Sequence, residues 1–87
     1  MTSKKKNGKP VVHFINEKRT LEQLQKLVGG YIEMQTMDDG RQLIFNEDGK
    51  MMNLPLNKPA MDFLPNRLYG QTVVGDAVIL SGDGLID

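Results

Sequence analysis

The segment TLEQLQKLVGGYIEMQTMDDGRQLIFN, residues 20–46, decides the fold because it predicts a helix followed directly by a β-hairpin. Thr20 and Gln23 have the Thr-x-x-Gln spacing of a capping box, which marks the start of a helix. Apolar residues then recur at helical spacing: Leu21, Leu24, Leu27 and Val28. Gly29 stands where a helix needs a left-handed residue after its last turn. We therefore predict a helix over residues 21–28.

The residues after this helix predict two antiparallel strands. Residues 31–37 alternate between apolar and polar side chains, and residues 42–46 are rich in apolar side chains. Asp39-Gly40 lies between them and is a strong hairpin signal, because a type I′ turn needs a positive φ at both central residues. We therefore expect the two strands to pair through a type I′ turn.

The flanking segments predict further strands. VVHFI, residues 11–15, is a β-branched and aromatic run, and VVGDAVIL, residues 73–80, is a second one with Gly75-Asp76 at its start or at a bulge. Asp48-Gly49 repeats the turn signal, so residues 50–55 are expected to run back as a short third strand that Pro55 ends.

A short second helix is expected after that strand. Asn57 is a suitable N-cap residue, Pro59 fits the first turn, and Pro65 would stop the helix. Leu85 and Ile86 form a late apolar pair that is expected to pack on the body of the protein or on a partner.

These elements together predict an α+β fold. We expect a small antiparallel or mixed sheet of four to five strands, with one main helix packed on one face and a short second helix. Residues 1–10 are predicted to be a disordered basic tail, and residues 11–87 a single α+β domain.

The composition argues against catalysis. The 87 residues include no cysteine and one histidine, His13, and neither Ser3 nor Ser81 lies in a nucleophile motif. The sequences DDG and EDG are typical of turns rather than of metal sites. We therefore expect a protein that is not an enzyme, with no catalytic residues, no metal and no cofactor. No apolar run is long enough to span a bilayer, so no membrane association is expected.

The charge is distributed unevenly. The tail holds Lys4, Lys5, Lys6 and Lys9, and residues 10–87 keep seven basic residues against eleven acidic ones, a net charge of −4. A basic arm can hold a domain on nucleic acid, whereas a solvated tail has no such role. An acidic body makes nucleic acid an unlikely partner.

The remaining function class is binding. Asparagine side chains offer both a donor and an acceptor, which suits a nucleobase edge or a peptide backbone, although they also cap turns and helices. The tyrosines are amphipathic contact residues or lie at the edge of the core. Methionines fill gaps in cores but also form adaptable surfaces. The predicted ligand-binding residues are Asn53, Asn57, Lys58, Tyr31, Tyr69 and Arg67.

Three segments together resemble the family called domain of unknown function 3846, which occurs in phages and mobile elements. They are LEQLQKLVGGYIEMQ, IFNEDGKMMNLPLNKPA and VVGDAVIL, and the resemblance covers about residues 21–80. The Lys-rich start and the sequence GDGLID fall outside it. The resemblance implies a viral or mobile-element origin, no established activity and no catalytic residues to transfer.

The resemblance also leads to a functional hypothesis. Small acidic phage proteins of this kind act as accessory factors by binding, so we expect one that counters host defence by sequestering a small nucleotide signal. The alternatives are an inhibitor that binds a host protein and a protein that associates with nucleic acid through its lysine tail. A homo-oligomer in the cytoplasm of an infected bacterial host is expected.

Overall fold

The computed structural model describes residues 9–64 and 71–87, and the helix predicted from the capping box has the expected bounds. Helix α2 spans Leu21–Val28; Gln23 N–H donates to Thr20 Oγ1 at 3.1 Å, and Thr20 N–H donates to Gln23 Oε1 at 2.8 Å. Gly29 is left-handed with φ +83° and ends the helix. The predicted apolar stripe is narrower than expected, because Leu21 is 58% exposed.

The predicted hairpin forms, but its turn differs from the prediction. Strands β2, Ile32–Thr36, and β3, Gln42–Asn46, pair antiparallel. Only Gly40 of the turn has a positive φ, +92°, so the type I′ prediction is wrong. Gly40 N–H donates to Met37 O at 3.0 Å and Met37 N–H to Arg41 O at 2.7 Å. This pattern fits a three-residue loop in which a type I turn is followed by a left-handed glycine.

Asp39 fixes the end of this turn. Its carboxylate accepts from the Arg41 backbone N–H at 3.1 Å and from Arg41 Nε at 2.8 Å. The backbone N–H is the main reason that the pKa of Asp39 lies below its ordinary value of 3.8. Because the folded-state pKa is lowered, this contribution to stability is present above pH 3.8 and is lost as the pH falls below it.

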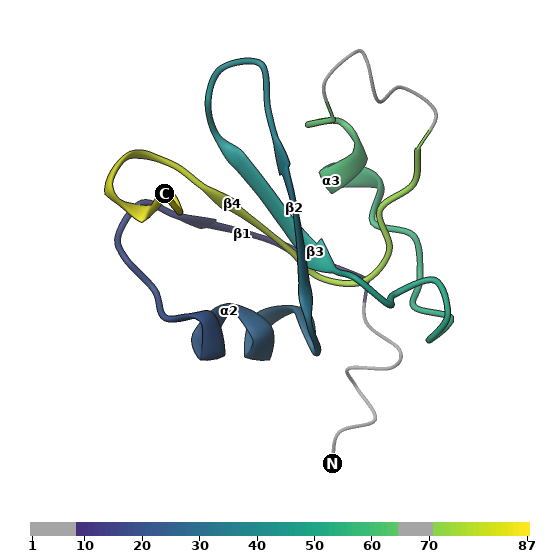
Figure 1. Cartoon of the computed structure of the whole chain (residues 1–87). Coiled ribbons are helices and arrows are strands. Elements are labelled where there is room, and N and C mark those ends of the chain that lie inside the picture. The colour runs from purple at the N-terminus through teal and green to yellow at the C-terminus, as the bar shows by residue number, and fades with distance from the viewer. Residues whose placement is uncertain (1–8, 65–70) are drawn as a thin grey trace.

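The hairpin is half of a four-stranded mixed sheet with the order β1-β4-β3-β2 (Figure 1). Strand β1, Val12–Ile15, pairs parallel with β4, Ala77–Leu80, and β4 pairs antiparallel with β3. Strand β4 begins directly after Gly75-Asp76, so this dipeptide marks the start of the strand and not a bulge within it. The predicted α+β class, with one main helix and a short second helix, is confirmed.

Apolar side chains cover both faces of the sheet. The core on the α2 face consists of Ile15, Leu24, Val28, Ile44, Val78 and Leu80. The core on the opposite face, near α3, consists of Met37, Leu43, Ala60, Val73, Ala77 and Ile79. Since successive residues of a strand point to opposite faces, all four residues of β4 are buried. Phe14 of β1 is an exception among the large apolar residues of these strands, since it is 64% exposed.

The predicted third strand after Asp48-Gly49 does not form. Residues 47–53 make successive turns, and their backbone groups bond locally: Met52 N–H donates to Asp48 O at 3.0 Å, and Leu54 N–H to Gly49 O at 3.1 Å. Only an isolated bridge, Leu56 to Val74, has the pairing of a strand. The third strand is absent because the backbone N–H groups of this segment donate to local carbonyl groups. They are therefore not available to pair with a neighbouring strand.

The second helix and the apolar pair at residues 85–86 follow the predictions. Helix α3 spans Lys58–Met61, with Asn57 as N-cap and Pro59 in the first turn; Pro65 lies outside the described residues. Leu85 packs against the core on the α2 face, after a short 3₁₀ turn, η2, at Gly82–Gly84. The Gln42 side chain exchanges two hydrogen bonds with the Ile86 backbone, at 2.8 and 2.7 Å, so this segment is held on the body of the protein.

Candidate functional site

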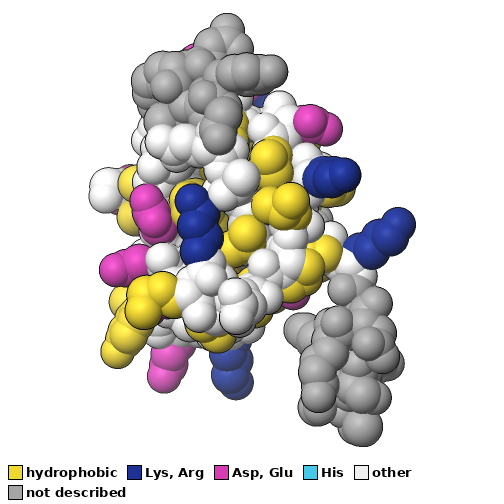
Figure 2. All heavy atoms as spheres, turned by 90° about the vertical axis from the view of Figure 1, so that its right-hand side faces the viewer, with side chains coloured by type: hydrophobic (Ala, Val, Ile, Leu, Met, Phe, Trp, Pro, Cys, Tyr) yellow, Lys and Arg dark blue, Asp and Glu magenta, His cyan; other side chains and the backbone are white. Residues whose placement is uncertain are grey.

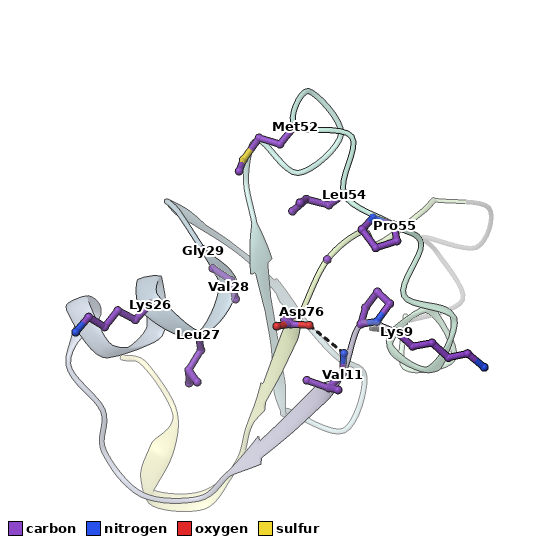
Figure 3. A pocket seen from close by; sticks show the side chains of 12 residues that line it. Lys9, Val11, Lys26, Leu27, Val28, Gly29, Met52, Leu54, Pro55 and Asp76 are labelled. Carbon is purple, nitrogen blue, oxygen red and sulfur yellow. Dashed lines mark hydrogen bonds between the residues drawn. The ribbon is translucent and has the colours of Figure 1, made fainter. Parts of the chain in front are cut away.

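A cavity of about 430 Å³ lies where the end of α2 approaches the starts of β1 and β4 (Figure 3). Its size falls in the range of roughly 300–1,000 Å³ that is typical of small-molecule sites. The residues that line it are Lys9, Pro10, Val11, Lys26, Leu27, Val28, Gly29, Met52, Leu54, Pro55, Gly75 and Asp76. Four segments that are far apart in sequence therefore form one apolar hollow with a few polar groups.

Gly75 determines how closely these segments approach. Its φ is +77°, and its N–H donates to Pro55 O at 2.7 Å. A Cβ atom placed on Gly75 would lie 2.6 Å from Leu54 Cδ1. Glycine is therefore needed here for two reasons: other residues rarely adopt this backbone conformation, and a side chain would prevent the close contact with Leu54. This contact fixes Leu54 and Pro55 as one wall of the cavity.

Asp76 places a carboxylate between the starts of the two parallel strands. Its Oδ1 accepts from Val11 N–H at 3.0 Å, as the dashed line in Figure 3 shows. This bond ties the segment before β1 to the residue before β4. The cavity consequently contains a fixed hydrogen-bond acceptor within largely apolar walls.

The opposite wall is the C-terminal end of α2. Gln25 O accepts from Gly29 N–H at 2.8 Å and from Gly30 N–H at 3.0 Å, and Val28 O accepts from Asn46 Nδ2 at 3.1 Å. The end of a helix carries a partial negative charge from such carbonyl groups. The three hydrogen bonds hold the end of α2 in place as one wall of the cavity.

Two lysines stand at the rim of the cavity. Figure 3 shows Lys26 and Lys9 at opposite ends, with both ammonium groups directed away from the interior. Both side chains are exposed. Their flexible stems allow them to meet an anion that projects from the cavity into water.

None of the predicted ligand-binding residues that the structure describes lines the cavity. Asn57 is fully buried: Oδ1 accepts from Ala60 N–H at 3.0 Å, and Nδ2 donates to Val11 O and Gly75 O at 3.1 and 2.8 Å. This amide is occupied inside the fold, as the alternative role of asparagine in capping predicts. Asn53 is exposed, with a left-handed φ of +57°.

The other predicted residues lie elsewhere. Lys58 is the exposed first residue of α3, and Tyr31, 68% exposed, precedes β2. Arg67 and Tyr69 lie outside the described residues, as do Lys4, Lys5 and Lys6. Among the predicted ligand-binding and tail residues that the structure describes, Lys9 alone lines the cavity. The sequence predicted Lys9 only as part of a nucleic-acid tail.

Sequence reasoning missed most of the cavity. Lys26, Leu54 and Asp76 were assigned no role in binding, although Gly75-Asp76 was noted as the start of a strand or a bulge. Gly75 was the signal in the sequence that another segment lies close to this strand, since an isolated glycine in a strand pattern often marks a close approach of another backbone.

An exposed apolar surface adjoins the cavity. Met51 is 84% exposed, Met52 50% and Leu56 49%, whereas Met37 is buried. Figure 2 shows hydrophobic side chains running across this side of the molecule with Lys or Arg side chains on both sides. The methionines therefore divide between the two roles that the sequence left open, core filling and adaptable surface.

The described residues contain neither a cluster of metal ligands nor a membrane-spanning helix. In residues 9–64 and 71–87, no three His, Asp or Glu side chains are grouped so that they could hold a metal ion. Over the same ranges no helix has the length and apolar character that crossing a membrane requires.

Comparison with known proteins gives one match. The family model of a domain of unknown function, DUF3846, matches residues 3–86. This match extends beyond the resemblance seen over residues 21–80. It includes the Lys-rich start and the GDGLID segment up to Ile86, which the resemblance had left outside. No curated protein and no solved structure matches the chain.

Proposed function

The chain belongs to the DUF3846 family, and from this premise we propose that it acts by binding a small nucleotide in the cavity beside α2. The observation that carries the proposal is the combination of apolar walls with lysines at both ends of the cavity. A nucleobase is flat and largely apolar, whereas its phosphate needs cations or water. Such a ligand would place the base inside and the phosphate at the rim.

The lining favours binding over catalysis. Within the described residues its titratable side chains are Lys9, Lys26 and Asp76, and the Asp76 carboxylate accepts from the Val11 amide. A nucleophile with an adjacent base would be needed for covalent catalysis, and this lining offers no such pair. We therefore propose a protein that is not an enzyme and releases its ligand unchanged.

The biological role is the second half of the proposal. The resemblance of the three sequence segments to phage and mobile-element proteins supports a phage accessory factor in the cytoplasm of an infected bacterial host. There, sequestration of a nucleotide signal would counter host defence. A homo-oligomer is part of this proposal, and β2, as an edge strand, offers one element through which copies could pair.

Thermal unfolding with nucleotides tests the proposal. The probes are the ribonucleoside 5′-monophosphates, their 3′,5′-cyclic forms and cyclic dinucleotides. A bound nucleotide at ~100 times its Kd should add ~2.7 kcal/mol to the free energy of unfolding, which raises Tm by roughly 10–20 °C in a domain of this size. Chromatography after denaturation should recover the nucleotide intact.

Matched lysine variants assign the effect to the cavity. The double variant Lys9→Met with Lys26→Met should lose most of the Tm increase, because it removes both rim cations. Lys50→Met is the control, since Lys50 is exposed and does not line the cavity. If no nucleotide raises Tm, the proposal is wrong. Recovery of a chemically converted nucleotide would show instead that the protein is an enzyme.

A second candidate rests on the exposed apolar surface of Met51, Met52 and Leu56. Exposed apolar patches mark protein interfaces, so this surface favours an inhibitor that binds a host protein. In that case Met51→Glu abolishes inhibition of the host process, while the melting temperature stays unchanged by all nucleotides. Association through the lysine tail is the third alternative, and nucleic-acid affinity that survives deletion of residues 1–9 would exclude it.

A further inference from the structure

We infer from the open edge of β1 that a second copy of the chain pairs with this strand, antiparallel and about a twofold axis at Phe14. The pairing would join the two four-stranded sheets into one continuous sheet. It gives the homo-oligomer of the proposed function a definite interface, and it rests on that function in this respect alone. It does not depend on what the cavity binds.

The first step is the direction of the backbone groups of β1. The carbonyl groups of Val11 and Ile15 accept from N–H groups of β4 and of the residue after it, each at 3.0 Å. Backbone groups along a strand point alternately to its two sides, so the even-numbered residues direct theirs away from β4. Those residues are Val12, Phe14 and Asn16.

These groups are free for pairing. The sheet order places β1 at an edge. Within residues 9–64 and 71–87, the backbone N–H and C=O groups of Val12, Phe14 and Asn16 have no hydrogen-bond partner. A row of such groups is a template for another strand.

The second step is the exposed aromatic ring on this edge. Phe14 is 64% exposed, and its ring meets that of Phe63 edge-on with the centroids 5.8 Å apart. The guanidinium of Arg41 lies 5.4 Å from the centroid of Phe63. With the axis at Phe14, the two Phe14 side chains lie opposite each other, and cross-strand aromatic pairs stabilise antiparallel sheets. Each exposed ring would thus gain a second aromatic neighbour.

The third step is the register. Residues that direct their backbone groups outward pair with each other in an antiparallel ladder. With the axis at Phe14, Val12 of one copy faces Asn16 of the other, so all three free residues of each copy exchange hydrogen bonds. An axis at His13 would place Asn16 opposite Pro10, which has no N–H to donate.

The fourth step explains why the partner is a second copy and why the edge is β1. Sheet edges are protected from self-pairing by charged side chains or proline within the strand. The sequence of β1, VHFI, contains neither, so a copy of the same strand meets no like charge. The other edge, β2, carries the exposed Glu33. The edge that lacks this protection is therefore β1.

Sedimentation equilibrium without nucleotide tests the pairing. We expect a mass that rises with concentration from 9.8 kDa towards twice that value. Phe14→Glu places two carboxylates opposite each other at the axis, so we expect the Kd of the dimer to rise at least about tenfold. Met34→Glu is the matched control, because it adds the same charge at an exposed residue of β2 and should leave the Kd unchanged.

A mixture of variants separates a lost contact from a lost fold. Phe14→Lys should weaken the dimer as Phe14→Glu does, whereas an equimolar mixture of the two should restore it, because opposite charges then face each other. The Tm of each variant shows whether it folds. Val12→Pro replaces a variant that does not, since proline removes a donor that points away from β4 and no bond to that strand.

Four outcomes would overturn the inference. The first is a chain that stays monomeric up to roughly 1 mM. The second and third are a dimer that neither Phe14→Glu nor Val12→Pro weakens and a dimer that Met34→Glu breaks, since the copies then pair elsewhere. The fourth is a monomeric chain in which Phe14→Glu abolishes inhibition of a host process, because the edge then takes a strand of the host protein.

These results are distinguishable from failure of the proposed function. If no nucleotide raises Tm but Phe14→Glu breaks a dimer, the proposed function is wrong and the pairing stands. If nucleotides bind to a chain that stays monomeric, the pairing is wrong and nucleotide binding stands.

Discussion

Replacing Asn57 by alanine is expected to lower the free energy of unfolding by about 2–4 kcal/mol. The fully buried amide accepts from Ala60 N–H and donates to Val11 O and Gly75 O. Loss of an N-cap costs about 1 kcal/mol, and the buried Gly75 carbonyl left without this donor costs about 1–3 kcal/mol. The Val11 carbonyl still accepts from Ala77 N–H at 3.0 Å. The variant loses at once the hydrogen bonds through which Asn57 connects α3, the segment before β1 and the segment before β4.

Urea and thermal unfolding measure this effect. The expected drop in Tm is roughly 8–32 °C, since 1 kcal/mol shifts Tm by about 4–8 °C in a domain of this size. Asn53→Gly is the matched control, because Asn53 is exposed and has a positive φ that glycine adopts without strain. A loss below about 1 kcal/mol for Asn57→Ala would show that water replaces the buried amide.

Gly75→Ala is expected to cost about 2–5 kcal/mol, from two sources. A non-glycine residue in the left-handed region costs about 1–2 kcal/mol, and the new methyl group would lie 2.6 Å from Leu54 Cδ1. Overpacking of this kind costs about 1–3 kcal/mol. Because Leu54 lines the cavity, its displacement should also weaken nucleotide binding.

Gly40→Ala separates the two sources. Gly40 has a φ of +92°, yet a Cβ atom there meets nothing within 4 Å. Equilibrium unfolding should therefore show only the backbone cost, about 1–2 kcal/mol, and calorimetry should show unchanged nucleotide affinity. Equal losses for the two variants would mean that Leu54 moves aside without cost, contrary to the close contact described above.

Local signals were sufficient for much of the fold. The capping box at Thr20 and the glycine after Val28 gave the bounds of α2, because both ends of a helix are satisfied by neighbouring residues. Asn57 and Pro59 likewise predicted α3. The segment after Asp48-Gly49 was predicted wrongly, since a turn signal does not say whether the next N–H groups will bond locally or to a strand.

The cavity could not be predicted in the same way, because it depends on segments that meet only in three dimensions. Asn57 illustrates the difficulty: its value as a cap was visible in the sequence, but its bonds to Val11 O and Gly75 O were not. Asp76 likewise acquires its position from an amide at Val11. Neither spacing nor composition indicates such distant partners.

The central position of β4 has a consequence for synthesis on the ribosome. Residues 77–80 are translated late, yet they lie between β1 and β3 and supply Val78 and Leu80 to the core beneath α2. The hairpin and α2 need only local contacts and can form while the chain is growing, whereas pairing of distant segments is slow. Until β4 emerges, the nascent chain therefore has no strand to fill the space between its first strand and its hairpin. We expect chaperones to bind it most readily during that interval.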